Sequence, residues 1–225
     1  MALQSKISKP PPQPDSDLSQ DTALCDLRFR ALLPDADWKC LPPATRQRFS
    51  KRLADGRTAI YVGEVIEISF NRIGWWLAQM ARLIGGPLPI STDTHVPSIV
   101  TVTEDATTRG QVWTRIYARR NGFPQVIHSS KRFAGSTGLE EYLGYGIGMA
   151  LRIVVHGEDL LFRSAGYFLQ LDQWKFWLPA FLAPGALTVT HSDLGNGEFQ
   201  FALELIHPRF GMLVRQSAVF REATP

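Results

Sequence analysis

Four charged side chains could give this chain a ligand-anchoring site, because they occur in strand-like segments rich in apolar residues: Arg115, Lys131, Arg132 and Glu141. A charged group among apolar neighbours must pair with an opposite charge or face a wet cavity. One interpretation is therefore a structural ion pair. The other is that Arg115 or Arg132 anchors the acidic head group of a ligand in an apolar pocket, since a guanidinium matches the geometry of a carboxylate.

The histidines provide no metal-binding pair, because none lies within four residues of another: His95, His128, His156, His191 and His207. We therefore expect no metal site. His128 shares a strand face with Ser130 and Arg132, and with Arg115 and Glu141 it could supply acid, base or orienting groups. These residues have no spacing typical of catalysis, and the sequence contains no nucleophile-elbow, zinc-protease or phosphate-loop motif. We expect no catalytic residues and no cofactor.

Residues 71–86 have the pattern of an apolar helix that interrupts the strand-like segments. The helical period places these residues on one face: Ile73, Trp76, Leu77, Met80, Leu83 and Ile84. Gly85, Gly86 and Pro87 end the helix. Two interpretations remain open. One is a core helix packed on a sheet; the other is a lid or interfacial helix whose paired tryptophans, Trp75 and Trp76, touch lipid or a ligand.

The segments around this helix alternate between apolar and polar residues, which predicts antiparallel strands. The first has its apolar residues on one face: Ile60, Val62, Ile66, Ile68 and Phe70. Asn121-Gly122 predicts a tight hairpin between two later segments. Long strands joined by short turns curl toward closure. We therefore expect an α+β, mainly antiparallel β fold: a strongly curved meander or half-open barrel of about 9–10 strands, with two or three short helices packed on or in it.

Composition limits the partners and the compartment. The 24 basic and 21 acidic residues give a net charge of +3, too small to predict nucleic-acid binding. Residues 1–22 are rich in proline and are expected to be a disordered tail, and residues 23–225 to form a single β-rich domain. We find no export signal and no apolar span of ~20 residues. Cys25 and Cys40 lack metal-ligand spacing and indicate a reducing compartment. We expect a cytoplasmic protein without a transmembrane span.

A series of short motifs resembles one known family. The motifs occur in order along the chain: Phe29-Arg30-Ala31-Leu32-Leu33, Leu41-Pro42-Pro43-Ala44-x-Arg46, Gly85-Gly86-Pro87-Leu88-Pro89, Trp113-x-Arg115, Glu141-x-x-Gly144, Leu178-Pro179-x-x-Leu182-x-Pro184, Gly197-x-Phe199-x-Phe201 and His207-Pro208-x-x-Gly211. Over about residues 27–221 the chain is similar to the bacterial domain of unknown function 4166 family. This resemblance implies no catalytic residues. It does imply that some relatives follow a saccharopine-dehydrogenase-like, nicotinamide-binding domain, for which this chain has no room before Phe29.

The favoured function is a binding module for a lipid-like or other hydrophobic small molecule in a cavity between the sheet and the helix, with peripheral membrane contact as a possible extension. The expected ligand-contacting residues are Trp75, Trp76, Met80, Trp113, Arg115, His128, Arg132 and Glu141. The alternative is an accessory or protein-interaction domain that acts with a separate NAD(P)-dependent saccharopine-dehydrogenase-like oxidoreductase. An enzyme using Arg115, His128 and Glu141 ranks third.

Overall fold

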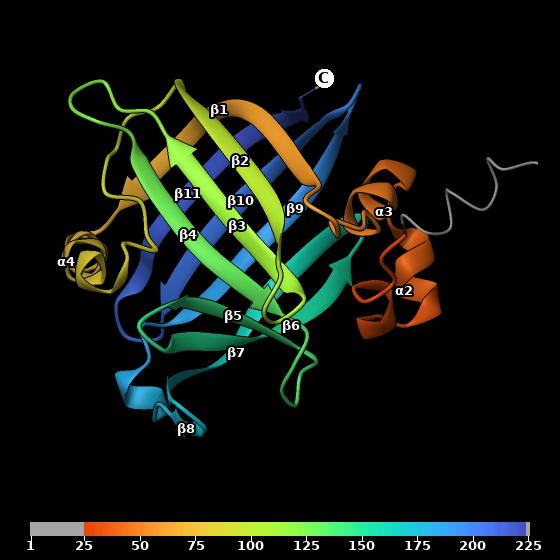
Figure 1. The fold of residues 1–225 in the computed structure, drawn as a ribbon. Helices are drawn as coiled ribbons and strands as arrows, with labels where there is room; N and C mark the ends of the chain where they lie inside the picture. Colours follow the sequence, from red (N-terminus) through yellow and green to blue (C-terminus); the bar gives the residue numbers. More distant parts are fainter. Residues whose placement is uncertain (1–24, 224–225) are drawn as a thin grey trace, which may run out of the picture.

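The chain folds into a closed barrel of ten antiparallel strands (Figure 1). A computed structural model describes residues 25–223. The strands are β1 (Thr58–Phe70), β2 (Val96–Asp105), β3 (Gly110–Tyr117), β4 (Gln125–Arg132), β5 (Leu139–Gly144), β6 (Ile147–His156), β7 (Asp159–Leu171), β8 (Trp174–Trp177), β9 (Ala186–Gly195), β10 (Glu198–His207) and β11 (Gly211–Glu222). The expectation of a curved antiparallel meander or barrel is confirmed. The predicted tail lies outside the described residues. The single domain over residues 23–225 stays a prediction.

Hydrogen bonding closes the barrel completely. Neighbouring strands pair in sequence order from β1 to β7, β7 pairs with β9, and β9, β10 and β11 lead back to β1. The strand β8 stays outside this ring and pairs only with the last residues of β7. Closure leaves no free edge in the ring, so the sheet must enclose its inward-facing side chains.

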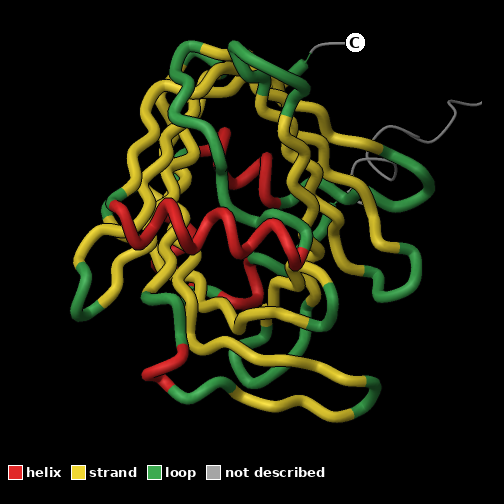
Figure 2. Tube along the Cα trace, turned by 90° about the vertical axis from the view of Figure 1, so that its left-hand side faces the viewer, coloured by secondary structure: helices red, strands yellow, loops and turns green. Residues whose placement is uncertain are grey.

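Helices cover both ends of the barrel. The short helices η1 (Arg30–Leu32), α2 (Asp35–Cys40) and α3 (Pro43–Phe49) lie at one end, which we call the α3 end. The helix α4 (Arg72–Ala81) and its continuation η2 (Arg82–Ile84) cross the opposite end, the α4 end, as Figure 2 shows. The last helix, η3 (Ala180–Leu182), follows β8. Among the residues that the structure describes, no helix has the length and apolar character needed to cross a membrane.

The first strand differs in one detail from the sequence prediction, which placed Ile60, Val62, Ile66, Ile68 and Phe70 on one face. Ala59, Tyr61 and Val65 are buried, whereas Ile60 and Ile66 are exposed. A register shift between Val65 and Glu67 in the pairing with β11 adds one residue to the strand. Because side chains alternate across a strand, the bulge makes odd-numbered residues face inward before it and even-numbered residues after it, so Ile60 and Phe70 do not share one face.

Packed aromatic rings fill the α3 end. Phe49 of α3 has its ring centroid 5.4 Å from Phe29, 5.6 Å from Phe162 and 5.1 Å from His191. Phe199 lies on the other side of His191, with the two rings stacked at 5.1 Å. All of these residues are buried. The core is therefore solid at this end of the barrel.

Candidate functional site in the barrel interior

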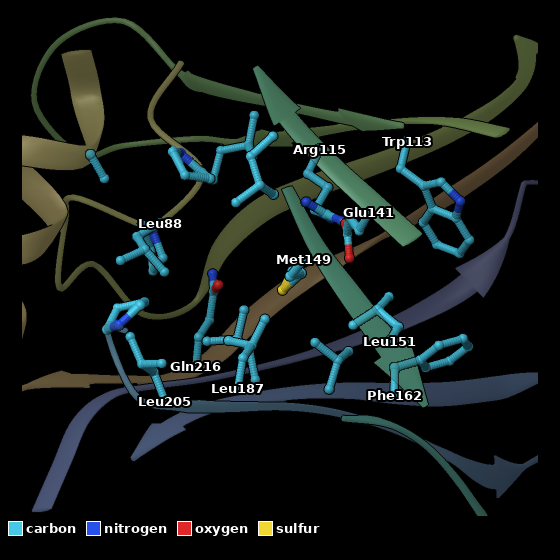
Figure 3. Close-up of a pocket in the computed structure, with 18 of the residues that line it drawn as sticks. Leu88, Trp113, Arg115, Glu141, Met149, Leu151, Phe162, Leu187, Leu205 and Gln216 are labelled. Atoms are coloured by element: carbon cyan, nitrogen blue, oxygen red, sulfur yellow. The ribbon is translucent and has the colours of Figure 1, made fainter. Parts of the chain in front are cut away.

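An apolar cavity of about 370 Å³ lies in the barrel between the aromatic core and α4 (Figure 3). Its wall is formed mainly by aliphatic and aromatic side chains from many strands, including Met149, Leu151, Phe162, Leu187, Leu203 and Leu205. The closed sheet produces this lining because every second residue of a strand points inward. Small-molecule pockets in proteins have this character, with volumes of ~300–1,000 Å³ and a few placed polar groups.

The cavity reaches the surface at the α4 end. Leu77 and Ile84 from the α4 segment line it on one side, and Leu178 and Leu182 line it on another. Leu182 is 61% exposed although it also lines the cavity. The opening therefore lies beside η3.

Three charged side chains from neighbouring strands meet in the cavity wall. The carboxylate oxygen Oε1 of Glu141 on β5 accepts hydrogen bonds from Lys131 Nζ on β4 at 3.0 Å and from Arg115 Nη2 on β3 at 3.2 Å. The same Arg115 nitrogen donates to Ser129 Oγ at 3.1 Å. The strand register explains this meeting, because Lys131 stands directly opposite Glu141 and Arg115 opposite Ile127. Figure 3 shows Arg115 and Glu141 side by side in the wall.

The electrostatics of this cluster keep Glu141 ionised. Burial alone would raise the pKa of its carboxyl, but the adjacent Lys131 and Arg115 cations outweigh burial and bring the pKa down to about 2. For Lys131, burial is the largest influence and lowers the pKa of the ammonium, and the Arg115 charge acts in the same direction, while Glu141 opposes both. Lys131 also lies 4.8 Å from the ring centroid of Trp113. One carboxylate is thus the counterion of two cations in a largely apolar wall.

Further polar groups line the cavity that the sequence prediction did not include. Tyr117 on β3 hydrogen-bonds to Gln216 on β11, and burial raises the pKa of the Tyr117 hydroxyl. The Tyr167 hydroxyl on β7 donates to the backbone oxygen of Gly185 at 2.9 Å. The inward alternation of β3 could have indicated Tyr117, because it shares a strand face with Trp113 and Arg115.

The predicted ligand-contacting residues fall into three groups in the structure. Trp113, Arg115 and Glu141 line the cavity together. His128 and Arg132, on β4, do not line it: the His128 side chain is exposed and pairs with Thr114 Oγ1 at 3.0 Å, and the Arg132 guanidinium stacks 4.0 Å above the Tyr142 ring. Since His128 and Arg132 alternate with the inward-facing Ile127 and Lys131, they lie on the outer face of the barrel.

The third group, Trp75, Trp76 and Met80, is exposed on α4 and does not line the cavity. Only Leu77, Ala81 and Ile84 of the α4 segment reach it. The helix is therefore neither a simple core helix nor a helix that offers its tryptophans to the cavity.

The arrangement does not assemble the three-residue acid–base site considered from the sequence, because His128 lies on the outer face while Arg115 and Glu141 line the interior. Within residues 25–223, no cluster of three or more His, Cys, Asp or Glu side chains could hold a metal ion. Cys25 and Cys40 are both exposed free thiols. The chemistry that the cavity offers is non-covalent: apolar contact along most of the wall and charge-assisted hydrogen bonding at Lys131 and Arg115.

Comparison with known proteins identifies a family but no activity. The model of a family described as "Domain of unknown function (DUF4166)" matches residues 41–220. No curated protein and no solved structure matches the chain.

Proposed function

The chain belongs to the domain of unknown function 4166 family, and for this member we propose binding of a hydrophobic small molecule that carries one acidic group. The apolar part of the ligand would fill the barrel cavity, and its acidic group would bind Lys131 and Arg115. The proposal refines the lipid-like ligand expected from the sequence.

One observation carries the proposal: two cations share one carboxylate oxygen in the wall of an apolar cavity. With both cations protonated, the cluster has one positive charge in excess. A buried charge without a full counterion is costly, so an anion that enters the cavity gains charge-assisted hydrogen bonds that offset the loss of its own hydration. An arginine fork beside a lysine suits a carboxylate especially well.

The cavity volume sets the size of the ligand. A cavity of about 370 Å³ lies at the small end of the ~300–1,000 Å³ range of ligand pockets, so it suits a short-chain acid better than a full-length lipid. Decanoate is an acid of this kind and combines an apolar chain with a carboxylate. Its neutral analogue 1-decanol has nearly the same chain and lacks the charge.

Titration calorimetry with these two compounds tests the proposal. We expect decanoate to bind about tenfold more tightly than 1-decanol, because a charge-assisted hydrogen bond is roughly twice as strong as a neutral one. The variant Arg115→Leu should reduce this preference without abolishing 1-decanol binding. Arg132→Leu, which alters a neighbouring guanidinium on the outer face, is the matched control and should bind both compounds like the unmodified chain. Failure of both compounds to bind a folded protein would contradict the proposal.

A further inference from the structure

The helix α4 packs on the barrel mainly with its small residues and Leu77, and presents most of its large apolar residues to solvent. Gly74, Ala78 and Ala81 are buried. A Cβ atom at Gly74 would lie 1.8 Å from the backbone oxygen of Leu213, so the helix can approach β11 only because this residue is glycine. On the outer side, Trp76 is 63% exposed and Met80 is 59% exposed. This is the reverse of an ordinary surface helix, whose apolar stripe faces the core.

A second exposed apolar element adjoins the cavity opening. The segment formed by β8 and η3 exposes Trp174, Phe176, Trp177 and Phe181, the last of which is 81% exposed. Figure 1 shows this segment, α4 and the β3–β4 hairpin on the same side of the molecule, and Figure 2 shows that side facing the viewer with α4 across it. Single exposed apolar residues are ordinary, but many of them at one end of a protein mark an interaction surface.

Exposed arginines accompany these apolar residues. In the segments that form the α4 end, residues 71–95, 118–124, 145–146, 172–185 and 208–210, the exposed arginines are Arg72, Arg82, Arg119, Arg120 and Arg209. The acidic residues of the same segments are Asp93 and Asp172. Among the described residues, Arg72 and Arg209 form no ion pair. The surface therefore combines indole rings, long aliphatic side chains and guanidinium groups.

We propose that the α4 end docks on the surface of an anionic phospholipid bilayer. Tryptophan and other large apolar side chains on an amphipathic helix insert at the boundary between head groups and acyl chains, and arginines add attraction to anionic lipid. The exposed residues of α4, β8 and η3 supply the first contribution, and Arg72, Arg209 and their neighbours supply the second.

The opposite end of the barrel has exposed charged residues but few exposed apolar residues. It also carries exposed basic residues, such as Arg57 and Arg221. In the described part of the chain, its exposed large apolar residues are Leu27, Ile60 and Leu194, none of which is aromatic. Positive charge alone therefore does not select the docking end, whereas its combination with exposed aromatic rings does.

The opening beside Leu182 lies within the proposed docking surface, so an apolar ligand could pass between the bilayer and the cavity without crossing bulk water. The docking itself requires no ligand in the cavity, and it goes beyond the proposed binding function. Trp76 and Met80 do not line the cavity, so each proposal can fail while the other stands.

Co-sedimentation with vesicles tests the docking. We expect the protein to bind vesicles of phosphatidylcholine mixed with phosphatidylglycerol, and to bind pure phosphatidylcholine vesicles more weakly. The double variant Trp76→Glu/Met80→Glu should lower the partition coefficient for the mixed vesicles at least about tenfold, because it puts charges where apolar groups enter the interface. Leu194→Glu at the opposite end is the control and should leave it unchanged.

The charge contribution has a separate test. Arg72→Glu/Arg209→Glu should abolish the preference for anionic vesicles, whereas Arg57→Glu/Arg221→Glu, with the same total change of charge at the α3 end, should retain it. The far-ultraviolet circular dichroism spectrum and the thermal unfolding temperature verify that the variants are folded. Absence of wild-type binding to anionic vesicles, or equal effects of the two double charge reversals, would overturn the proposal. It would also be overturned if Trp76→Glu/Met80→Glu converted a dimer into a monomer without changing vesicle binding, because the surface would then cover a second copy of the chain.

Discussion

The two ends of the barrel are built from similar residue types but use them in opposite ways. At the α3 end, aromatic rings such as Phe29, Phe49 and Phe199 pack against one another and are buried. At the α4 end, Trp76, Phe181 and their neighbours are exposed around the opening of the cavity. Burying an aromatic side chain stabilises the fold, and leaving it in water gives up that free energy. The contrast indicates that the α3 end stabilises the barrel, and it agrees with our proposal that the α4 end takes part in binding.

Buried titratable groups follow the same division. At the α3 end, His191 accepts a hydrogen bond from Arg48 Nη1 at 2.8 Å, and the Arg48 guanidinium lies 3.8 Å above the Phe199 ring. This contact belongs to a filled core. The Lys131–Glu141–Arg115 cluster instead faces a cavity, where its excess positive charge is available to a ligand.

The largest expected effect compares the same class of substitution at the two ends. Phe49→Ala should lower the free energy of unfolding by about 3–5 kcal/mol, because it leaves a cavity among packed rings. Trp76→Ala should change it by no more than ~0.5 kcal/mol, because most of that side chain is in water. Urea denaturation of both variants measures the difference. Equal losses would contradict the division between a stabilising end and a binding end.

Glu141→Gln should destabilise the protein by about 3 kcal/mol, because it leaves the buried Lys131 and the partly buried Arg115 without their carboxylate. Saturating decanoate should restore part of that loss in denaturant unfolding, whereas 1-decanol should restore less. The unmodified chain should also lose stability as the pH falls below about 4.5 toward 2, since the pKa of the folded-state carboxyl, about 2, is lower than that of the unfolded chain. Identical rescue by the two compounds would show that charge is not what the ligand supplies.

His191→Gln tests the core at the α3 end through pH. Burial, followed by the Arg48 charge, lowers the pKa of His191 to about 3. The unfolded chain therefore binds one more proton than the folded chain between about pH 6.5 and 3, and this group removes about 1.4 kcal/mol of stability per pH unit as the pH falls through that window. Glutamine cannot titrate but can still accept the hydrogen bond from Arg48. The variant should show a shallower loss of stability in acid; an unchanged slope would assign the acid sensitivity to other groups.

A smaller effect concerns ligand affinity in alkali. Because burial lowers the pKa of Lys131, this side chain should lose its proton at a lower pH than an exposed lysine, and one positive charge then leaves the cavity wall. Decanoate affinity should fall several-fold as the pH rises through the pKa of Lys131, with 1-decanol affinity unchanged. In Lys131→Met the decrease should disappear. An equal change in the affinities of decanoate and 1-decanol with pH would contradict this role of Lys131.

The architecture could be predicted from the sequence because it depends on local patterns. Alternation and turn residues indicated the antiparallel barrel. The predicted hairpin of β3 with β4 is present, but Asn121-Gly122 lies within a longer connection between Tyr117 and Gln125 instead of forming a tight turn. The short strand β8 could not be predicted in the same way, because its four residues are too few to show a clear alternation. Alternation cannot show which face of a strand points inward when both faces carry polar residues. On β4 this left Arg132 in the predicted site in place of the adjacent Lys131.

The orientation of α4 on the barrel could not be predicted from a local sequence pattern either. The helical period placed Ile73, Trp76, Leu77, Met80, Leu83 and Ile84 on one face, but the structure divides this set: Leu77 and Ile84 line the cavity, whereas the other four are exposed. Which side of the helix meets the barrel depends on a contact far away in the sequence. The close approach of Gly74 to Leu213 turns the small residues inward and most of the large ones outward. Sequence alone therefore identified the unusual helix and left its two interpretations open.

The central claim, that the cavity binds an apolar acid at the Lys131–Arg115 pair, is tested most directly by ¹³C NMR of carboxyl-labelled decanoate with the intact protein. We predict a separate bound resonance whose carboxyl has a lower pKa than free decanoate in water. In Arg115→Leu, the pKa of the bound carboxyl should move toward the free value. A bound carboxyl that titrates as it does in water, or the absence of any bound resonance, would contradict it.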